Sequence, residues 1–298
     1  MSQDGVSVPT VSIVVPCYNG GCFLDGLMAC LAAQTFRDFE VIVVDDGSTE
    51  EGTRRKLAQL DPAVRVVRQA NTGPAAARNT GIRHSRGTYV LPLDCDDTIE
   101  PTFIAETLDR LWRIAPEAGF VFTHMRLTGA LEGVLPRHFN RFDQLFLNRL
   151  PYCVLIPRSA WERVGGYDEV IPRGYEDWEF NIRLAKAGFR GIEIPKPLFV
   201  YRISPAGLLM GVASRLHGTR WRYIRDKHRD LYRLPALVEL WRASRIEAGT
   251  MSPLAAGGLL ALAKLLPEDW FNNLFHRAML VERARRASRG EFRIVRPA

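Results

Sequence analysis

From Val11 to about residue 127, short runs of β-branched and apolar residues alternate with segments that have the 3.6-residue period of amphipathic helices. This alternation is typical of a mostly parallel sheet covered by helices, and it restricts the fold class more than any other feature of the chain. We predict strands at Val11–Val15, Glu40–Val44, Val64–Arg68, Thr88–Leu93 and Gly119–Thr123, and helices at Cys22–Gln34, Thr53–Gln59, Pro74–His84 and Pro101–Ile114.

The second half of the chain contains fewer strand signals. Gly129–Asn148 is less regular, and it is either a mobile acceptor loop or a simple connection. We then predict a strand at Tyr152–Pro157, helices at Arg158–Val164 and Glu176–Ala187, and a last strand at Phe199–Ile203. Helical, arginine-rich sequence follows, so we place an α/β domain at 1–205 and a helical, basic region at 206–298.

Composition excludes several classes of protein. Hydrophobic residues make up 47% of the 298 positions and charged residues 24%, which excludes a disordered chain or a fibrous repeat. The five cysteines include no C-x-x-C pair, so we expect a reducing compartment. Residues 1–9 lack the features of a secretory signal, and no window holds the roughly 18 apolar residues of a membrane span. We therefore expect a cytoplasmic location.

Polar side chains follow three of the predicted strands. Pro16-Cys17-Tyr18-Asn19 comes after the first strand, Asp45-Asp46-Gly47-Ser48 after the second, and Asp94-Cys95-Asp96-Asp97 after the fourth. Ligands bind at the carboxyl ends of parallel strands, because loops and helix N-termini converge there. The three loops therefore predict a single site.

The acidic loop after the fourth strand has two interpretations. Asp94, Asp96 and Asp97 repel one another unless a cation lies between them. Their oxygen ligands favour Mg²⁺ or Mn²⁺, with phosphate oxygens completing the coordination shell. Alternatively, the same residues cap the helix that begins near Pro101. The D-x-D spacing by itself fits both interpretations equally.

The remaining loops suit a nucleotide, although each also has a simpler explanation. Asp46 can accept a hydrogen bond from a nucleobase or ribose, or it can belong to an ordinary Asx-turn. Tyr18 can flank a base, or it can cover the sheet edge. Small residues around Gly73 allow close backbone approach, and Arg78 can hold phosphate; the same segment also reads as a turn that enters an alanine-rich helix.

Together, V-S-I-V-V-P-C-Y-N at 11–19, Q-T-F-R-D-F-E at 34–40, V-D-D-G-S-T at 44–49, G-P-A-A-A-R-N at 73–79 and L-D-C-D-D at 93–97 closely resemble glycosyltransferase family 2. The resemblance covers residues 8 to 203. It implies a GT-A fold, with a Rossmann-like nucleotide-binding half and an acceptor-binding half. It also implies nucleotide-sugar contacts by Pro16, Tyr18, Asn19, Asp46, Gly73, Arg78, Asp94 and Cys95, and a Mn²⁺ or Mg²⁺ ion at Asp96 and Asp94.

The family also has a late acidic motif at a helix start, and Gly174-Tyr175-Glu176-Asp177-Trp178-Glu179 resembles it. Inversion at the anomeric carbon requires a base that takes the proton of the acceptor hydroxyl. By motif position Asp177 is that base and Glu176 the second choice. Sugar or acceptor contacts are expected from Asp97, Tyr175 and Trp178. Without the upstream motifs, these acids would be explained by the helix dipole.

The basic C-terminal region also has two interpretations. The arginine-rich segment at 215–233, with the later apolar runs 254–266 and 270–286, can contact anionic headgroups at the inner face of a membrane and suit a lipid-linked acceptor. Alternatively, its helices pack on the catalytic domain. The net charge of +7 favours an anionic partner. Nucleic acid is disfavoured, because no recognition motif accompanies the charge.

We therefore expect an inverting, metal-dependent glycosyltransferase that uses a nucleotide-diphosphate sugar, preferably a UDP-sugar, and a glycan or lipid-linked acceptor in bacterial cell-surface polysaccharide synthesis. Two alternatives are a nucleotide-sugar-binding protein without turnover and a sugar nucleotidyltransferase on a related fold. The second is disfavoured because no glycine-rich phosphate loop with arginine follows the first strand. A dinucleotide oxidoreductase is disfavoured because G-x-G-x-x-G is absent there.

Overall fold

The structure is a computed structural model, which describes residues 8–114, 118–171, 174–204, 216–249 and 251–295. The predicted alternation of strands and helices is present in its first half. The strands are β1 (Val11–Cys17), β2 (Phe39–Asp46), β3 (Val64–Gln69) and β4 (Tyr89–Pro92). The helices are the 3-10 turn η1 (Gly21–Phe23), α1 (Leu24–Ala32), α2 (Glu51–Ala58), α3 (Pro74–His84) and α4 (Phe103–Ile114).

The first sheet has the strand order β3-β2-β1-β4-β8. β1 pairs in parallel with both β2 and β4, while the short β8 (Ile156–Pro157) is antiparallel to β4. All seven residues of β1 are buried, as expected for a central parallel strand covered on both faces. Helix α3 lies very close to this sheet: a Cβ on Gly81 would meet Val14 Cγ1 at 2.3 Å.

A second five-stranded sheet extends the architecture beyond the single sheet that we predicted. Its order is β10-β7-β6-β9-β5, and only β6 and β9 are parallel to each other among its described pairs. β6 and β9 are much longer than the predicted strands at 119–123 and 199–203. The bounds are β5 (Thr98–Ile99), β6 (Gly119–Gly129), β7 (Leu131–Leu135), β9 (Arg190–Ile203) and β10 (Phe292–Ile294).

Two sequence predictions are wrong in this sheet. The segment 129–148 is not wholly irregular, because Gly129 adopts φ 89° and lets the chain turn from β6 into β7; the 3-10 turn η2 (Asp143–Leu145) follows. The sheet region also does not end at Ile203, because β10 pairs with β7. Pairing between segments so distant in the sequence leaves no local signal.

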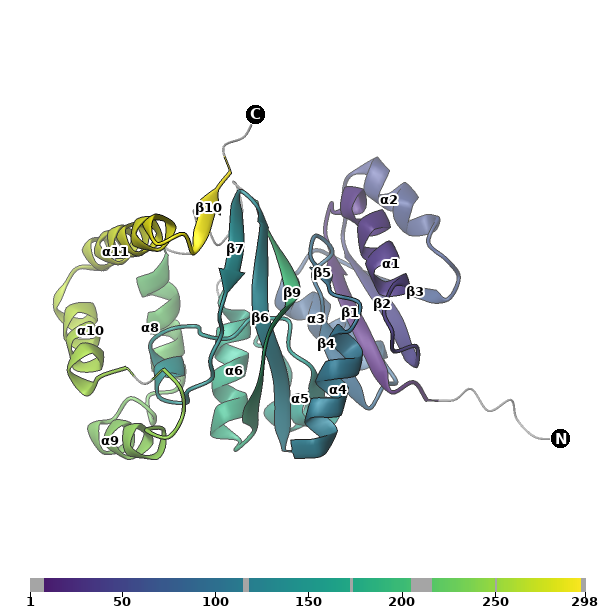
Figure 1. Cartoon of the computed structure of the whole chain (residues 1–298). Coiled ribbons are helices and arrows are strands. Elements are labelled where there is room, and N and C mark those ends of the chain that lie inside the picture. The colour runs from purple at the N-terminus through teal and green to yellow at the C-terminus, as the bar shows by residue number, and fades with distance from the viewer. Residues whose placement is uncertain (1–7, 115–117, 172–173, 205–215, 250, 296–298) are drawn as a thin grey trace.

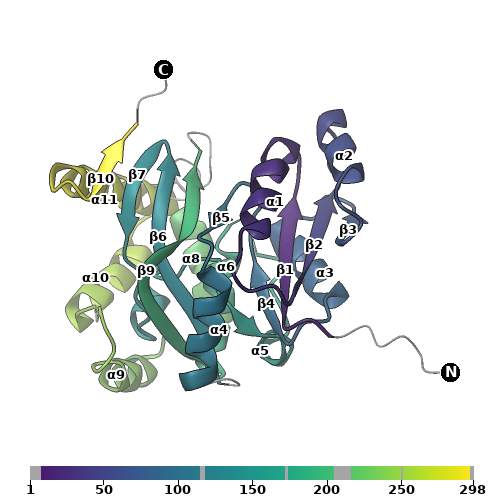
Figure 2. The same cartoon turned by 45° about the vertical axis from the view of Figure 1, so that its right-hand side comes forward.

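The helices after the last long strand pack on the second sheet and on α6 (Glu176–Lys186). They are α8 (His217–Lys227), α9 (Leu234–Ala243), α10 (Pro253–Leu265) and α11 (Glu268–Ser288), while α5 (Arg158–Val164) belongs to the earlier part of the chain. Figures 1 and 2 both show α9, α10 and α11 on the side of the second sheet away from β1–β3. No helix in the described part of the chain combines the length and apolar character that crossing a membrane requires.

A separate apolar core joins these helices to the earlier part of the chain. It contains Phe146 after η2, Trp178 and Ile182 of α6, Trp221 of α8 and Phe271 of α11. The arginine-rich segment contributes to this packing, since Arg220 is 2% exposed and Trp221 is fully buried; Arg215 lies outside the described residues. For this part of α8, the structure supports the packing interpretation.

Candidate active site

A pocket of about 210 Å³ lies at the carboxyl ends of β1, β2 and β4. It brings together the three loops that follow these strands, as the sequence predicts. Its lining residues are Pro16, Cys17, Tyr18, Asp46, Asn71, Gly73, Pro74, Asp94, Cys95 and Asp96. The predicted residues Asn19, Arg78 and Asp97 do not line it, nor do those of the late acidic motif.

Asp46 is held firmly at the pocket wall. Its Oδ1 accepts hydrogen bonds from Gln69 Nε2 at 2.8 Å and from the Thr72 amide at 2.9 Å, and its Oδ2 accepts from the Gly73 amide at 2.9 Å. Gly73 adopts φ 95°, a conformation that glycine reaches without strain. Asp46 therefore fixes the conformation of the loop that contains Thr72 and Gly73. The Asx-turn that we considered for this pair is formed by Asp45, which accepts from the Ser48 amide at 2.9 Å.

Tyr18 and Asn19 have different placements. Tyr18 lines the pocket and is 48% exposed, so its ring is available to a ligand. Asn19 faces the loop before α2, where its Oδ1 accepts from the Thr49 and Glu50 amides at 2.8 and 3.0 Å. The prediction that Asn19 contacts the nucleotide is therefore corrected: its side chain fixes two neighbouring loops to each other.

Arg78 does not reach the pocket, which corrects its predicted phosphate contact. Its side chain is buried under the site, where Nη2 donates to Asp94 Oδ1 at 2.8 Å and Nη1 donates to Glu176 Oε1 at 2.8 Å. Although burial opposes the charge, Asp94 and Glu176 raise the pKa of Arg78 well above its usual value. The guanidinium thus joins the D-x-D loop to the start of α6.

The three acids after β4 are not equivalent. Asp97 is 2% exposed and accepts from the Arg202 amide at 2.7 Å and from the Tyr152 hydroxyl, so it is buried away from any sugar and its predicted contact is wrong. Asp94 is engaged by Arg78. Asp96 is half-buried at the pocket wall, and among the described residues its carboxylate has no hydrogen-bond partner from another residue.

The surroundings of Asp96 suit a divalent cation. Burial and the charge of Asp94 raise the pKa of Asp96, so a positive ion between the two carboxylates would relieve a real electrostatic cost. Mg²⁺ and Mn²⁺ need only one or two protein carboxylates when phosphate oxygens complete the shell. Within the described residues there is no cluster of three or more acidic, histidine or cysteine ligands, so such a site would depend on a ligand's oxygens.

Two thiols border the D-x-D loop. Cys17 and Cys95 both line the pocket, and a hydrogen bond from Cys95 is the main reason why the pKa of Cys17 is lowered. Both sulfurs pack against Gly20, where an added Cβ would meet Cys95 Sγ at 2.4 Å. Cys95 therefore has a defined place beside the predicted metal ligands.

The late acidic motif begins α6, and its two candidate bases, Glu176 and Asp177, have different surroundings. Glu176 is 7% exposed and paired with Arg78. Asp177 is half-buried, and its Oδ2 accepts from Asn148 Nδ2 at 2.9 Å. Burial and the charge of Glu176 raise the pKa of Asp177 to about 6. Of the two carboxylates, Asp177 is therefore the one whose proton affinity suits proton transfer near neutral pH.

The two aromatic residues of this motif serve mainly to fix the helix. Trp178 is 1% exposed, and its Nε1 donates to the Gln144 carbonyl; its predicted contact with sugar is therefore wrong. Tyr175 has φ 74° at the start of α6, and its hydroxyl pairs with Nδ1 of the buried His217 at 3.0 Å. Tyr175 is half-buried.

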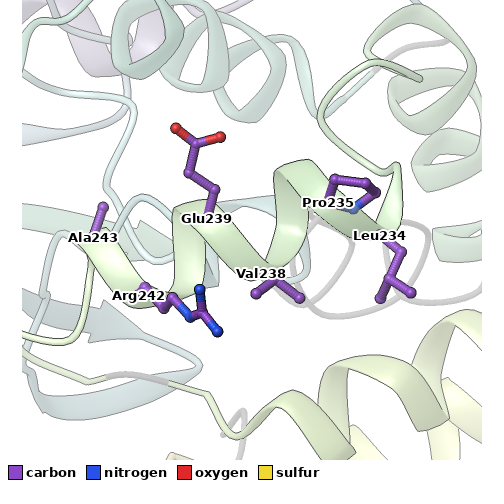
Figure 3. A pocket seen from close by; sticks show the side chains of 6 residues that line it. All are labelled: Leu234, Pro235, Val238, Glu239, Arg242 and Ala243. Atoms are coloured by element: carbon purple, nitrogen blue, oxygen red, sulfur yellow. The ribbon is translucent and has the colours of Figure 1, made fainter.

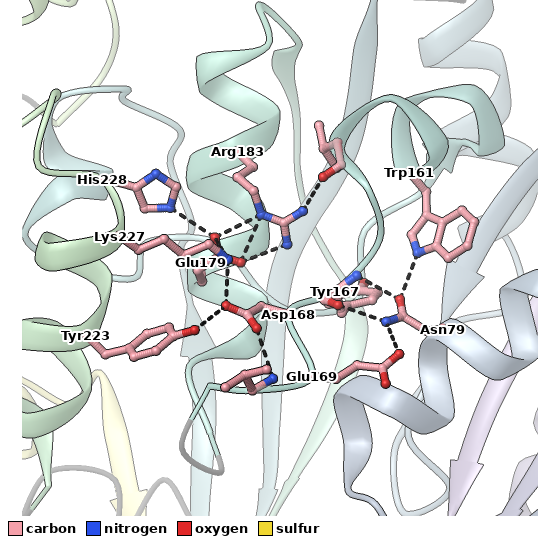
Figure 4. Close-up of polar contacts among 12 residues, drawn as sticks. Asn79, Trp161, Tyr167, Asp168, Glu169, Glu179, Arg183, Tyr223, Lys227 and His228 are labelled. Atoms are coloured by element: carbon pink, nitrogen blue, oxygen red, sulfur yellow. Dashed lines mark hydrogen bonds and ion pairs between the residues drawn. The ribbon is translucent and has the colours of Figure 1, made fainter.

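A polar network ties α6 to α8 (Figure 4). Glu179 is fully buried and binds Arg183, Lys227 and His228, with N···O distances from 2.7 to 3.0 Å. Lys227 also pairs with Asp168 at 2.5 Å. The helix that carries Asp177 is therefore anchored from the C-terminal region.

Sequence reasoning missed four side chains near the acids. Asn148 binds Asp177, Tyr152 binds the Asp94 amide and Asp97, and the charge of Arg202 partly offsets the rise in the pKa of Asp96. Burial and the charges of the D-x-D acids and of Asp177 raise the pKa of Tyr201. None lies in a recognisable motif; the nearest signal was the end of the predicted strand at 199–203.

A wider hollow of about 790 Å³ lies along α9, away from the acids. Figure 3 shows Leu234, Val238 and Arg242 on one side of this helix and Glu239 on the other. It contains no group of catalytic side chains.

Comparison with known proteins gives the family. Residues 12–148 match the sequence profile described as "Glycosyl transferase family 2". Residues 12–148 therefore belong to glycosyltransferase family 2. It is 30% identical over 226 residues to the uncharacterized glycosyltransferase EpsJ of Bacillus subtilis, an alignment that covers 67% of this chain and 63% of EpsJ. The chain thus spans less than two thirds of the length of the curated relatives that it matches most strongly.

Solved structures show that the chain has the GT-A fold. The mannosyltransferase PcManGT from Pyrobaculum calidifontis, in complex with GDP-Man and Mn²⁺, aligns with a TM-score of 0.59 at 20% identity, over 94% of this chain and 88% of that chain. TarS 1–349 of S. aureus, in complex with UDP-GlcNAc, aligns with a TM-score of 0.60 at 17% identity, over 92% of each. The predicted fold class is therefore confirmed.

Proposed function

We propose that this chain is an inverting, metal-dependent glycosyltransferase that moves a sugar from a nucleotide-diphosphate donor, preferably a UDP-sugar, to a hydroxyl of a glycan or lipid-linked acceptor. The supporting observation is one pocket that unites Tyr18, Asp46 and Asp96 and is joined through Arg78 to the helix of Asp177. Bacterial cell-surface polysaccharide synthesis is the setting that suits such a reaction.

The donor nucleotide lies in the pocket at the ends of β1 and β2. Pro16 and Tyr18 flank the base, and Asp46 and the Gly73 backbone border the ribose side. The solved relatives carry two different nucleotides, GDP-Man in PcManGT and UDP-GlcNAc in TarS. A binding measurement with uridine and guanosine nucleotides is therefore the test of the proposed preference for uridine.

Asp177 performs the proton transfer. The acceptor oxygen forms a bond to the anomeric carbon on the face opposite the leaving group, the bond from that carbon to the diphosphate oxygen breaks, and the hydroxyl proton passes to the Asp177 carboxylate. Asn148 holds that carboxylate in place at 2.9 Å. A positioned base of this kind contributes about 10²–10⁴-fold to the rate.

Asp96, assisted by Asp94, would hold Mn²⁺ or Mg²⁺. A bound cation supplies positive charge that stabilises the departing diphosphate. Arg78 Nη2 donates to both oxygens of Asp94, at 2.8 and 3.1 Å, so the loop presents this carboxylate in one arrangement.

Peripheral membrane contact on the cytoplasmic side is part of the proposal. α10 and α11 expose large apolar side chains, including Leu254 at 89%, Leu265 at 78% and Trp270 at 70%. Exposed apolar residues of this size, beside cationic ones, suit the interface of an anionic bilayer. Co-sedimentation with anionic vesicles, for the wild type and for Trp270→Ser, tests this part; equal binding of both proteins would contradict it.

The main experiment measures sugar transfer and donor hydrolysis with a panel of nucleotide sugars, with Mn²⁺ and with EDTA. We expect one donor to be turned over, activity to disappear with EDTA, and Asp96→Ala and Asp177→Asn each to lose it. Asp109→Asn is the matched control, because Asp109 is exposed on α4 and pairs only locally, with Arg113. Full activity of both site variants would refute the assigned roles.

A further inference from the structure

Two thiols meet in the nucleotide pocket, and they come from neighbouring strands of the first sheet. Cys17 is the last residue of β1, and Cys95 lies in the loop that follows β4. A Cβ added to Gly20 would lie 3.5 Å from Cys17 Sγ and 2.4 Å from Cys95 Sγ, so both sulfurs border the same small volume. The Cys95 thiol also donates a hydrogen bond to the sulfur of Cys17. The two side chains therefore point toward each other.

The register of the sheet explains why these side chains meet. β1 and β4 are parallel, and Val14 opposite Pro92 is their last pair. The Leu93 amide still donates to the Val14 carbonyl at 2.9 Å beyond that pair. The same offset between partners, carried on to the end of β1, places Cys17 opposite Cys95. Neighbouring strands lie about 4.7–4.9 Å apart, within the range of about 4.4–6.8 Å between the Cα atoms of disulfide-bonded cysteines.

The other cysteines have different surroundings. All five lie in described segments, and all are free thiols. Cys22 is exposed, Cys153 is fully buried, and Cys30 Sγ donates to the Ile99 carbonyl at 3.1 Å. Of the five, Cys17 and Cys95 are the two that line the pocket. A bond between these two sulfurs would therefore form inside the donor site.

From this arrangement we propose that Cys17 and Cys95 form a disulfide when the protein meets hydrogen peroxide, and that this bond closes the donor site reversibly. The proposal adds regulation to the proposed function and rests on it. In the first step the O–O bond of the peroxide breaks, one thiol becomes a sulfenic acid and one water leaves. The second sulfur then displaces the sulfenic oxygen, which leaves as another water, and the S–S bond forms. The two thiols lose two electrons and two protons in total.

The bond would act on both sides of the pocket. Cys17 precedes Tyr18, which flanks the base, and Cys95 lies between the two proposed metal ligands, Asp94 and Asp96. An S–S bond of about 2.05 Å is far shorter than a contact between two thiols, so the D-x-D loop and the end of β1 must move toward each other. The carboxylates and the ring then leave the arrangement that suits a donor. In a reducing compartment, cellular thiols reverse such a bond.

Two measurements on the full chain test the proposal. Peptide mapping without reduction, after peroxide treatment and alkylation of the remaining thiols, identifies any linked cysteines. Isothermal titration with UDP and with GDP, each with Mn²⁺, measures binding before treatment, after removal of the peroxide, and after reduction with dithiothreitol. The variants are C17S, C95S and the double variant C17S/C95S. The matched control is Cys22→Ser, because the thiol of Cys22 is exposed.

We expect a peptide that links Cys17 to Cys95 in the oxidised wild type and in C22S, and none in the other variants. Oxidation should weaken nucleotide binding about tenfold or more in the wild type and in C22S, and dithiothreitol should restore it; C17S/C95S should keep its own untreated affinity. The proposal is overturned if no such peptide forms, if Cys22 is linked instead, or if the linked protein binds nucleotide as tightly as the reduced one. If the untreated wild type binds neither UDP nor GDP, the proposed donor site is refuted, whereas the peptide map still decides whether the bond forms.

Discussion

Replacing Glu179 with glutamine should destabilise the protein more than any surface substitution, because it removes a fully buried negative charge from three basic partners. Glu179 is fully buried and binds Arg183, Lys227 and His228. Gln keeps the shape of the side chain, but it leaves Arg183 and His228 without their ion-pair partner and Lys227 with Asp168 alone. Breaking a buried ion pair from one side costs about 3–5 kcal/mol.

The pKa of Glu179 gives an independent magnitude. Burial alone would raise it, yet the hydrogen bonds from His228 and Arg183, the charge of Arg183 and the bond from Lys227 outweigh burial and lower the pKa to about 2, from an ordinary value of 4.5. At 1.36 kcal/mol per tenfold change in proton affinity, this corresponds to about 3 kcal/mol. Since the folded pKa lies below the unfolded one, the stabilisation is complete above pH 4.5 and is lost as pH falls toward 2.

Urea unfolding at several pH values measures this effect. We expect E179Q to lose about 3 kcal/mol at pH 7, and the difference from wild type to shrink below pH 4.5. The matched control is Glu162→Gln, since Glu162 pairs with Arg158 at 3.0 Å and its side chain is 54% exposed; it should lose at most about 0.5 kcal/mol. The reasoning fails if E179Q is as stable as E162Q, or if its deficit is the same at pH 3 and pH 7.

Three further predictions concern the site and its support. The kcat/KM of the wild type should rise with pH through about 6, because Asp177 must be unprotonated to accept a proton; a flat profile from pH 5 to 8 would contradict its role as base. Arg78→Met should lower stability by about 3–5 kcal/mol, because it leaves Asp94 buried without its partner, which thermal unfolding with and without donor would detect. Gly81→Ala should cost about 1–3 kcal/mol, because the new Cβ would overlap Val14, and an unchanged denaturation midpoint would show that α3 can move away from the sheet.

The predicted fold was accurate where periodicity is local. Helices 74–84 and 158–164 have the predicted bounds, and the four first strands end within two residues of theirs. The position of the pocket followed from the same pattern, because the ends of parallel strands converge. Its four acidic and aromatic residues, Tyr18, Asp46, Asp94 and Asp96, all line it.

Side-chain roles were less predictable, because burial and partners depend on the tertiary structure. Arg78 and Asp97 stand at positions where the motif implies a ligand contact, yet each is 2% exposed and bonded within the protein. Trp178 lies next to the base in sequence, but the helical rotation between adjacent residues turns it into the core with α8 and α11. The sequence of a motif alone does not show which of its side chains are buried in the folded protein.

The pairing of β10 with β7 has a consequence for synthesis of the protein. Gly133 is placed opposite Phe292, about half the chain later. While the chain is being made, the edge of β7 therefore stays unpaired until the segment at 292–294 emerges, and an open strand edge is a site where nascent chains associate wrongly. Expression of shortened chains should accordingly yield aggregates from the second sheet, even where the nucleotide-binding half has already folded.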